Sequence, residues 1–374
     1  MITCEAYMEK NFQAGWYYNE RTDMKENVYL NCYTPVNIDK WFDRIQLNSE
    51  MKNLLLKIYQ KIGKLEGISE LLDKEELKNT DELIDRLNLM CCYTDENQLP
   101  DFAYFFGFAS DNELILEERQ KFKAFSDLRM LRRQHREKFI IHRQTIWVLR
   151  KEWNPTAPHR INDCLDDLIR IMSEFRSDLK KENAPLNPIL FSGLLYYQLL
   201  TVVPYDRNNI LYASYTVAKY LQELKVLPEI SYPLTKLIYD NKNECNDRMA
   251  EVRQACNINQ WLLFYLDILD KTFGTEYSFI KEKHRCLDRS RDVLNKAKNI
   301  PNHMKERMKR EMIMMYQKPV FRIEELMNDC DITHSTATKM VNLFIELKLV
   351  KQANDKQRYR VYEYIPLTEC IQRI

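Results

Sequence analysis

The sequence predicts a mainly α-helical protein that ends in a small mixed α/β module. The chain has 374 residues but only six glycines, whereas average usage of about 7% would give about 26. Because a turn-rich β-sandwich or barrel uses glycine in many turns, so low a number favours helices. Apolar residues also recur at helical spacing through most of the chain, and β-type runs gather close to its end.

The composition excludes several classes of protein. Apolar residues make up 45% and charged residues 30% of the chain, an ordinary globular mix. With so few glycines, neither G-x-G-x-x-G nor G-x-x-x-x-G-K followed by Ser or Thr can be written, which excludes Rossmann-type and Walker-type nucleotide sites. The net charge of +1 argues against a polyanion-binding surface over the whole chain, although a local basic face remains compatible with it.

The ten cysteines show no C-x-x-C pair and no regular cluster with His, so we expect no zinc or other metal site. The first residues, MITCEAYMEK, contain no apolar signal core. No window approaches 18 uncharged apolar residues, the length that a membrane-spanning helix needs. We therefore expect reduced thiols in a cytoplasmic protein that has no membrane partner.

The individual elements follow from hydrophobic periodicity, taken in chain order. The first 40 residues show no period, apart from a candidate short strand at 28–33, and a second strand is predicted at 145–149. Pro- and Asn-rich breaks separate the periodic stretches. Helices are predicted at 48–68, 81–92, 116–139, 160–180, 189–203, 210–225, 234–253, 258–273, 277–298, 305–317, 321–330 and 334–348.

These elements suggest three domains. Residues 1–100 form an N-terminal helical region, and residues 101–300 form a core around the nearly uncharged run ILFSGLLYYQLLTVV, which predicts a buried central helix. The segment IPNHM, at 300–304, is the expected boundary to a third domain at 301–374.

The C-terminal domain has the element order of a winged helix-turn-helix: three helices followed by a two-stranded hairpin. Ala337, Met340 and Phe344 lie on one face of its third helix, and short polar or basic side chains lie largely on the other. Such side chains suit base edges and phosphates in a major groove of DNA. The candidate DNA-binding residues are His334, Thr336, Thr338, Lys339 and Asn342 on the helix, and Lys356, Arg358 and Arg360 on the hairpin.

The alternative is that this domain packs on its own chain or on a protein partner. Between residues 303 and 374 there are 13 Lys and Arg residues against 10 Asp and Glu residues, a modest excess for a DNA-binding domain.

The junction LLTVVPYDRNNILYAS, between two predicted buried helices, resembles the motif H-P-F-x-D-G-N-G-R-x-x-R of Fic proteins. Most Fic proteins are protein adenylyltransferases, which transfer AMP from ATP to a hydroxyl group of a target protein. Weaker matches at KIGKLEGI, at TIWV, which resembles the strand of their target-docking flap, and in the helices after the junction extend the resemblance over residues 45–365. It implies a Fic (Fido) fold with a small β-hairpin flap, with ATP and Mg²⁺ as the family's cofactors.

The motif itself is degenerate between Val203 and Ser214. Without a gap, Val203 stands at the position of the catalytic His, Arg207 at that of the metal-binding Asp, and Leu211 and Ser214 at those of the two arginines. A one-residue deletion would match Asp206 and Asn208 instead, but would not restore the His. Since the resemblance gives the general base and the metal ligand to these positions, we expect little AMP transfer and assign no catalytic residue.

Two interpretations of the loop remain. Asp206, Arg207, Asn208 and Asn209 precede a helix N-terminus and are candidate ligands for a nucleotide or another anion. Alternatively, the loop is a polar surface segment whose asparagines cap the helix.

Many Fic proteins also carry an inhibitory helix in which Ser or Thr is followed, four residues later, by Glu and then by Gly or Asn. The segment CCYTDEN resembles this pattern, with Cys92 in place of Ser and with Glu96 and Asn97 matching. If the correspondence holds, Glu96 is expected to pair with Arg207.

Three functions follow from these features. The first is an inactive Fic-like regulator that binds DNA through its winged helix and senses a nucleotide or another anion. The second is an atypical nucleotidyl or phosphoryl transferase that modifies a protein through Asp206, Arg207 and Asn209. The third is a non-catalytic interaction scaffold that binds a protein or forms a homodimer.

Overall fold

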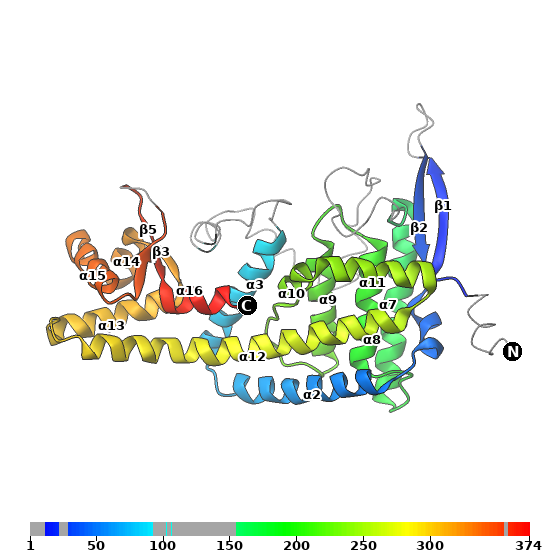
Figure 1. Ribbon diagram of the computed structural model, residues 1–374, viewed down its shortest axis with the longest axis horizontal. Helices are drawn as coiled ribbons and strands as arrows, with labels where there is room; N and C mark the ends of the chain where they lie inside the picture. Colours follow the sequence, from blue (N-terminus) through cyan, green and yellow to red (C-terminus); the bar gives the residue numbers. More distant parts are fainter. Residues whose placement is uncertain (1–11, 22–28, 93–101, 103–105, 107–154, 355–357) are drawn as a thin grey trace. The chain divides into compact units, whose positions relative to one another are not determined.

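The computed structural model describes residues 12–21, 29–92, 102, 106, 155–354 and 358–374 (Figure 1). These residues belong to two compact units. The first unit takes in Met1–Glu66, Gln120–Glu229 and Leu234–Phe273, and the second takes in Gly67–Arg119, Ile230–Pro233 and Gly274–Ile374. The described part of the chain is mainly α, as the sequence predicts.

The first unit contains one β-hairpin and a set of helices. Strands β1 (Gly15–Arg21) and β2 (Tyr29–Pro35) pair antiparallel, with Tyr18 opposite Cys32. The other elements are η1 (Ile38–Arg44), most of α2 (Ser49–Ser69), α7 (Pro158–Lys180), α8 (Pro188–Val202), α9 (Asn209–Glu223), α10 (Leu234–Asp240), α11 (Lys242–Ala255) and the first part of α12 (Ile258–Lys296).

Helix α8 forms the centre of this first unit. All its residues from Ile189 to Val202 are buried, as its nearly uncharged sequence predicts. Gly193 lets α12 approach closely, because a Cβ atom there would lie only 2.7 Å from Tyr265 Cδ1. At the same place, the indole N–H of Trp261 donates to the Gly193 carbonyl over 2.9 Å, and this bond fixes α12 against α8.

The second unit combines α3 (Lys74–Cys92) and the rest of α12 with the C-terminal elements. These are α13 (Asn302–Gln317), β3 (Val320–Arg322), α14 (Ile323–Cys330), α15 (His334–Glu346), β4 (Val350–Gln352), β5 (Val361–Tyr364) and α16 (Ile365–Gln372). The three strands form an antiparallel sheet in the order β3-β5-β4, with Lys351 opposite Glu363. The buried face of α15 consists of Ala337, Met340, Val341 and Phe344.

Eight described residues have a left-handed backbone, and none of them is a glycine. Several end helices: Lys348 follows α15, and the N–H of Leu349 bonds back to the carbonyl of Phe344 over 2.9 Å, the bond of a Schellman motif. Lys225 occupies the equivalent position after α9. The described glycines thus lie outside this conformation, and two of them, Gly15 and Gly193, lie at close contacts.

Several sequence predictions were wrong in detail. Strand β2 coincides with the candidate strand at 28–33, but its partner β1, in the described segment 12–21, was not predicted. The stretch 234–253 is two helices, α10 and α11, whereas 258–273 and 277–298 lie largely in one helix, α12. Strand β3 and helix α16 were missed. The predicted elements at 116–139 and 145–149 lie outside the described residues, and the three-domain partition stays a prediction.

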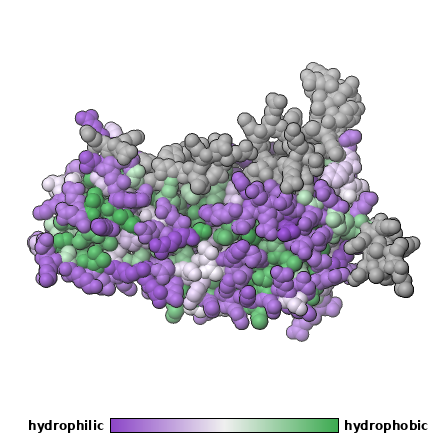
Figure 2. All heavy atoms as spheres, viewed as in Figure 1, coloured by the Kyte–Doolittle hydropathy of each residue, from purple (hydrophilic) through white to green (hydrophobic). Residues whose placement is uncertain are grey.

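No described helix is both long enough and apolar enough to cross a membrane. In the view of Figure 2, hydrophilic side chains cover much of the described surface, with apolar side chains showing between them.

Candidate functional site

The junction that resembles the Fic motif lies between α8 and α9, inside the first unit. Helix α8 ends at Val202, and the next residue, Val203, has a left-handed backbone (φ 52°). A β-branched residue rarely adopts this conformation, so the turn is set by the surroundings of Val203. Its side chain is only 2% exposed. The position of the family's catalytic His is therefore occupied by a packed apolar group.

Asn209 holds the loop by its side chain. Its Oδ1 accepts from the Tyr205 backbone N–H over 3.0 Å, and its Nδ2 donates to the Tyr205 carbonyl over 2.9 Å. The Tyr205 ring also packs on Tyr212 of α9, with ring centroids 3.9 Å apart. Burial raises the pKa of the Tyr205 hydroxyl, and the neighbouring Tyr212 raises it further. Both polar atoms of the Asn209 side-chain amide are thus hydrogen-bonded to the backbone, so that Asn209 has a structural role and braces the loop.

The other polar residues of the loop face outward. Asp206 and Arg207 are exposed, and Asn208 is partly exposed. Asn208 precedes α9 with a left-handed backbone, and its side chain makes no capping hydrogen bond. The prediction that asparagines cap this helix was therefore wrong for Asn208, and Asn209 bonds to Tyr205 instead.

Side chains of the core fill the positions that correspond to the family's arginines. Leu211 is fully buried, and Ser214 is 4% exposed. The Ser214 hydroxyl donates to the Ile210 carbonyl over 2.8 Å and lies within hydrogen-bond distance, 3.0 Å, of the Tyr196 hydroxyl. Neither residue can clamp a phosphate group as an arginine does.

The residues of the loop do not fit the Mg²⁺ ion that the Fic resemblance implies. The ungapped match places Arg207 at the family's metal-binding position, and a guanidinium cation offers Mg²⁺ no oxygen ligand. Among the described residues, no group of three or more His, Cys, Asp or Glu side chains could hold a metal ion.

The inhibitory-motif candidates are only partly described. Cys92 is the last residue of α3, and its thiol donates to the Asn88 carbonyl over 3.5 Å. Glu96 and Asn97 lie outside the described residues, and so does the expected ion pair between Glu96 and Arg207.

The C-terminal candidates lie on α15 and on the β4–β5 hairpin. His334, Lys339 and Asn342 are exposed, and Thr336 and Thr338 are partly exposed. Thr333 caps the helix, since its hydroxyl accepts from the Thr336 N–H over 3.4 Å. The structure thus separates a buried apolar face of α15 from a polar outer face, as predicted.

The hairpin presents fewer free cations than the sequence suggests. Arg358 and Arg360 are exposed, and Lys356 lies outside the described residues. Lys351, by contrast, is 2.9 Å from the nearly buried carboxylate of Glu363 on the opposite strand. The positive charge of Lys351 is therefore partly neutralised by Glu363 within the sheet.

Sequence reasoning missed buried charges in the second unit. Glu276 on α12 is fully buried, and burial raises the pKa of its carboxyl, with Asp81 and Asp85 of α3 adding to the shift. Lys283, two turns further along, is 1% exposed, and burial lowers its pKa to about 8. Its ammonium donates to the Tyr316 hydroxyl over 3.2 Å.

A third buried ionisable group, Glu311 of α13, lines a pocket with residues of α14 and α15. It stands in an apolar helical stripe with Met308, Met312 and Met315. A lone carboxylate among methionines at this spacing is the signal that could have singled it out from the sequence.

Comparisons with known proteins find similarity among solved structures. No family model matches the sequence, and no curated protein matches it. Among solved structures, the chain is similar to a Fic family protein from Desulfovibrio desulfuricans G20, which covers 86% of this chain and 97% of its own, with 12% sequence identity and a TM-score of 0.45. It belongs to the family that the central junction resembles. Because the identity and the TM-score are both low, the functional proposal rests on the residues of this chain.

Proposed function

We propose that the protein is a DNA-binding regulator whose C-terminal module is a winged helix-turn-helix and whose Fic-like core has lost AMP transfer. The observation that carries the proposal is the two-sided helix α15. Its apolar face is buried, and its outer face presents His334, Lys339 and Asn342 to solvent. An amide and a cation on a short exposed helix suit base edges and phosphates in a major groove.

The rest of the module supports the same function. The element order from α13 to β5 is helix, strand, two helices and a hairpin. In that order, α15 is the recognition helix and the β4–β5 hairpin is the wing. Arg358 and Arg360 on the wing are exposed, so their guanidinium groups are available to DNA phosphates.

The junction between α8 and α9 supports a core without AMP transfer. Transfer to a hydroxyl needs a general base and a group that neutralises the phosphate charge. At the position of the family's general base this chain has the buried Val203, and at that of its metal-binding Asp it has Arg207, which cannot ligate a metal ion. The amide of Asn209, a candidate ligand in the sequence, already bonds to Tyr205.

The experiment measures DNA binding by the full chain. Duplexes are first selected from a random library, and fluorescence anisotropy then gives the Kd of the best duplex at several salt concentrations. We expect affinity to fall steeply with salt, because released counterions drive the binding. Lys339→Ala and Arg358→Ala should each weaken binding by about fivefold to a hundredfold.

Lys57→Ala is the matched control, because Lys57 is also an exposed lysine, on α2 of the first unit. It should leave the Kd unchanged. If no duplex is enriched, or if all three variants bind as the wild type does, DNA binding is wrong and the scaffold hypothesis gains. Transfer of labelled nucleotide to a protein in a lysate, lost in Arg207→Ala, would establish the transferase instead.

A further inference from the structure

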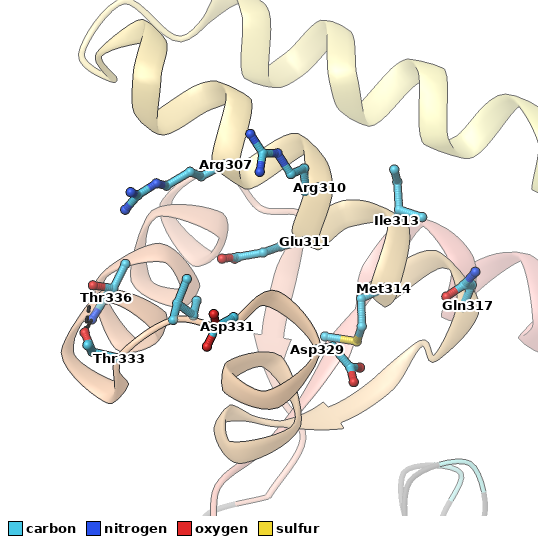
Figure 3. Close-up of a pocket in the computed structure, with 11 residues that line it drawn as sticks. Arg307, Arg310, Glu311, Ile313, Met314, Gln317, Asp329, Asp331, Thr333 and Thr336 are labelled. Atoms are coloured by element: carbon cyan, nitrogen blue, oxygen red, sulfur yellow. Dashed lines mark hydrogen bonds between the residues drawn. The ribbon is translucent and has the colours of Figure 1, made fainter.

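A pocket of about 1000 Å³ lies within the second unit, between α13 and the turn from α14 to α15 (Figure 3). Helix α13 contributes Arg307, Arg310 and Glu311 to its lining, and the turn contributes Asp329 and Asp331. Its volume is at the upper end of the range of small-molecule sites. Charges of both signs thus face one cavity.

Glu311 is the unusual member of this lining. It is 1% exposed, and neither carboxyl oxygen has a hydrogen-bond partner in the described part of the chain. In Figure 3 its carboxyl points from α13 toward the side of α15. A buried polar group without a partner is costly, and such a group in a pocket wall marks a position where a ligand can donate hydrogen bonds.

The arginines differ from Glu311, because both are exposed. Neither guanidinium forms an ion pair with another described residue, and each can therefore bind a carboxylate through two parallel N–H groups. They lie one turn apart on α13, so they frame the open side of the pocket.

These charges restrict the class of ligand. A purely anionic ligand would meet the carboxylates of Asp329 and Asp331, and a purely cationic one would meet Arg307 and Arg310. A metal ion does not fit either, because no metal-binding group of three side chains occurs among the described residues. A molecule that carries both charges satisfies both sets.

We propose that this pocket binds a small zwitterion of the amino-acid class, with its ammonium group donating to Glu311 and its carboxylate bound by Arg307 and Arg310. Thr333 and Thr336, in the first turn of α15, line the same pocket, so the ligand lies beside this helix. The proposal rests on the pocket alone and is tested without DNA, so its failure and that of DNA binding are separate results.

A proton accompanies the ligand. Burial raises the pKa of Glu311 to about 8, against an opposing effect of Arg307. At pH 7 the carboxyl is therefore largely neutral before binding. An ammonium group beside it favours the carboxylate and lowers that pKa, so binding releases a proton to the buffer.

The test uses the full chain at pH 7. Ligand-detected NMR screens the twenty common amino acids, and isothermal titration calorimetry then compares the best binder with its decarboxylated amine and its deaminated acid. We expect at least one amino acid to bind with a Kd below 10 mM, and each truncated probe to bind at least tenfold more weakly. If no amino acid binds, or if either truncated probe binds as well as the parent, the proposal is wrong.

Variants locate the site. Glu311→Gln keeps the size of the side chain and should weaken binding at least tenfold, and should abolish the dependence of the binding enthalpy on buffer ionisation. Arg310→Ala tests the other end at an exposed position, where folding is not at risk. Lys309→Ala, beside it on α13 and paired with Glu306 at 2.8 Å, is the control and should bind normally. Unchanged binding in Arg310→Ala would overturn the assignment, even if Glu311→Gln failed to fold.

Discussion

Replacing Gly193 by alanine tests the packing of the central helix. An added Cβ atom would lie 2.7 Å from Tyr265 Cδ1 and 2.8 Å from Leu262 Cδ2, both on α12. These distances are shorter than any real Cβ contact, so α12 or its side chains must move. Tyr265 has little room to move, because it is fully buried and its hydroxyl is hydrogen-bonded to Ser192 at 3.0 Å.

Two effects of opposite sign decide the magnitude. Alanine is favoured over glycine inside a helix by about 1 kcal/mol. Overpacking a core typically costs about 1–3 kcal/mol, and moving α12 also strains the bond from Trp261 to the Gly193 carbonyl. We therefore expect Gly193→Ala to lower the free energy of unfolding by about 1–2 kcal/mol.

The assay is urea unfolding followed by circular dichroism at 222 nm. Gly63→Ala is the matched control, because Gly63 lies inside α2 of the same unit and nothing lies within 4 Å of its added Cβ. This control should gain about 0.5–1 kcal/mol. If Gly193→Ala proves as stable as the control variant, the close approach of α8 and α12 is wrong.

Three further predictions concern single side chains. Asn209→Ala removes both hydrogen bonds to Tyr205 and should destabilise the chain by about 1–3 kcal/mol in urea; a loss under 0.5 kcal/mol would mean that the brace contributes nothing. Because the pKa of Glu311 is raised to about 8, its folded form holds a proton that the unfolded chain loses near pH 4.5, so stability should fall as the pH rises from about 5 to 8. In Glu311→Gln, the loss of unfolding free energy between pH 5 and pH 8 should be smaller than in the wild type by about 3 kcal/mol. Urea unfolding at pH 5, 6.5 and 8 measures it, and the same pH dependence in both proteins would contradict the assignment. Thr333→Ala removes the cap of α15 and should lower the stability by about 1 kcal/mol, measured by thermal unfolding. The control, Ser335→Ala, leaves the bond from the Thr336 N–H to the Thr333 hydroxyl in place and should cost less.

The sequence predicts most helices because their cores are local patterns. The buried run of α8 and the apolar stripe of α15 can be recognised from spacing alone. Strand β2 matches the candidate strand at 28–33, but β1 could not be recognised in this way, because Trp16 and Tyr17 are both well exposed and no strict alternation marks the strand. The break between α10 and α11 falls at Asn241, in a sequence with no Gly or Pro to announce it.

The candidate site shows the same division. The exposed positions of Lys339 and Asn342 follow from helical periodicity. The bonds from Asn209 to Tyr205 depend on the turn of the loop, and the sequence offers a capping role equally well. The pocket beside Glu311 needs the spacing of three helices, which no local pattern contains.

The left-handed residues at the helix ends are positions where a substitution can raise the thermal stability of the protein. A side chain other than glycine or asparagine in this conformation costs about 1–2 kcal/mol, partly offset by the greater freedom of glycine in the unfolded chain. Lys225 and Lys348 are exposed at such positions, so their side chains contribute little packing. Glycine at these two positions is therefore a route to a more heat-resistant protein that leaves every buried contact as it is.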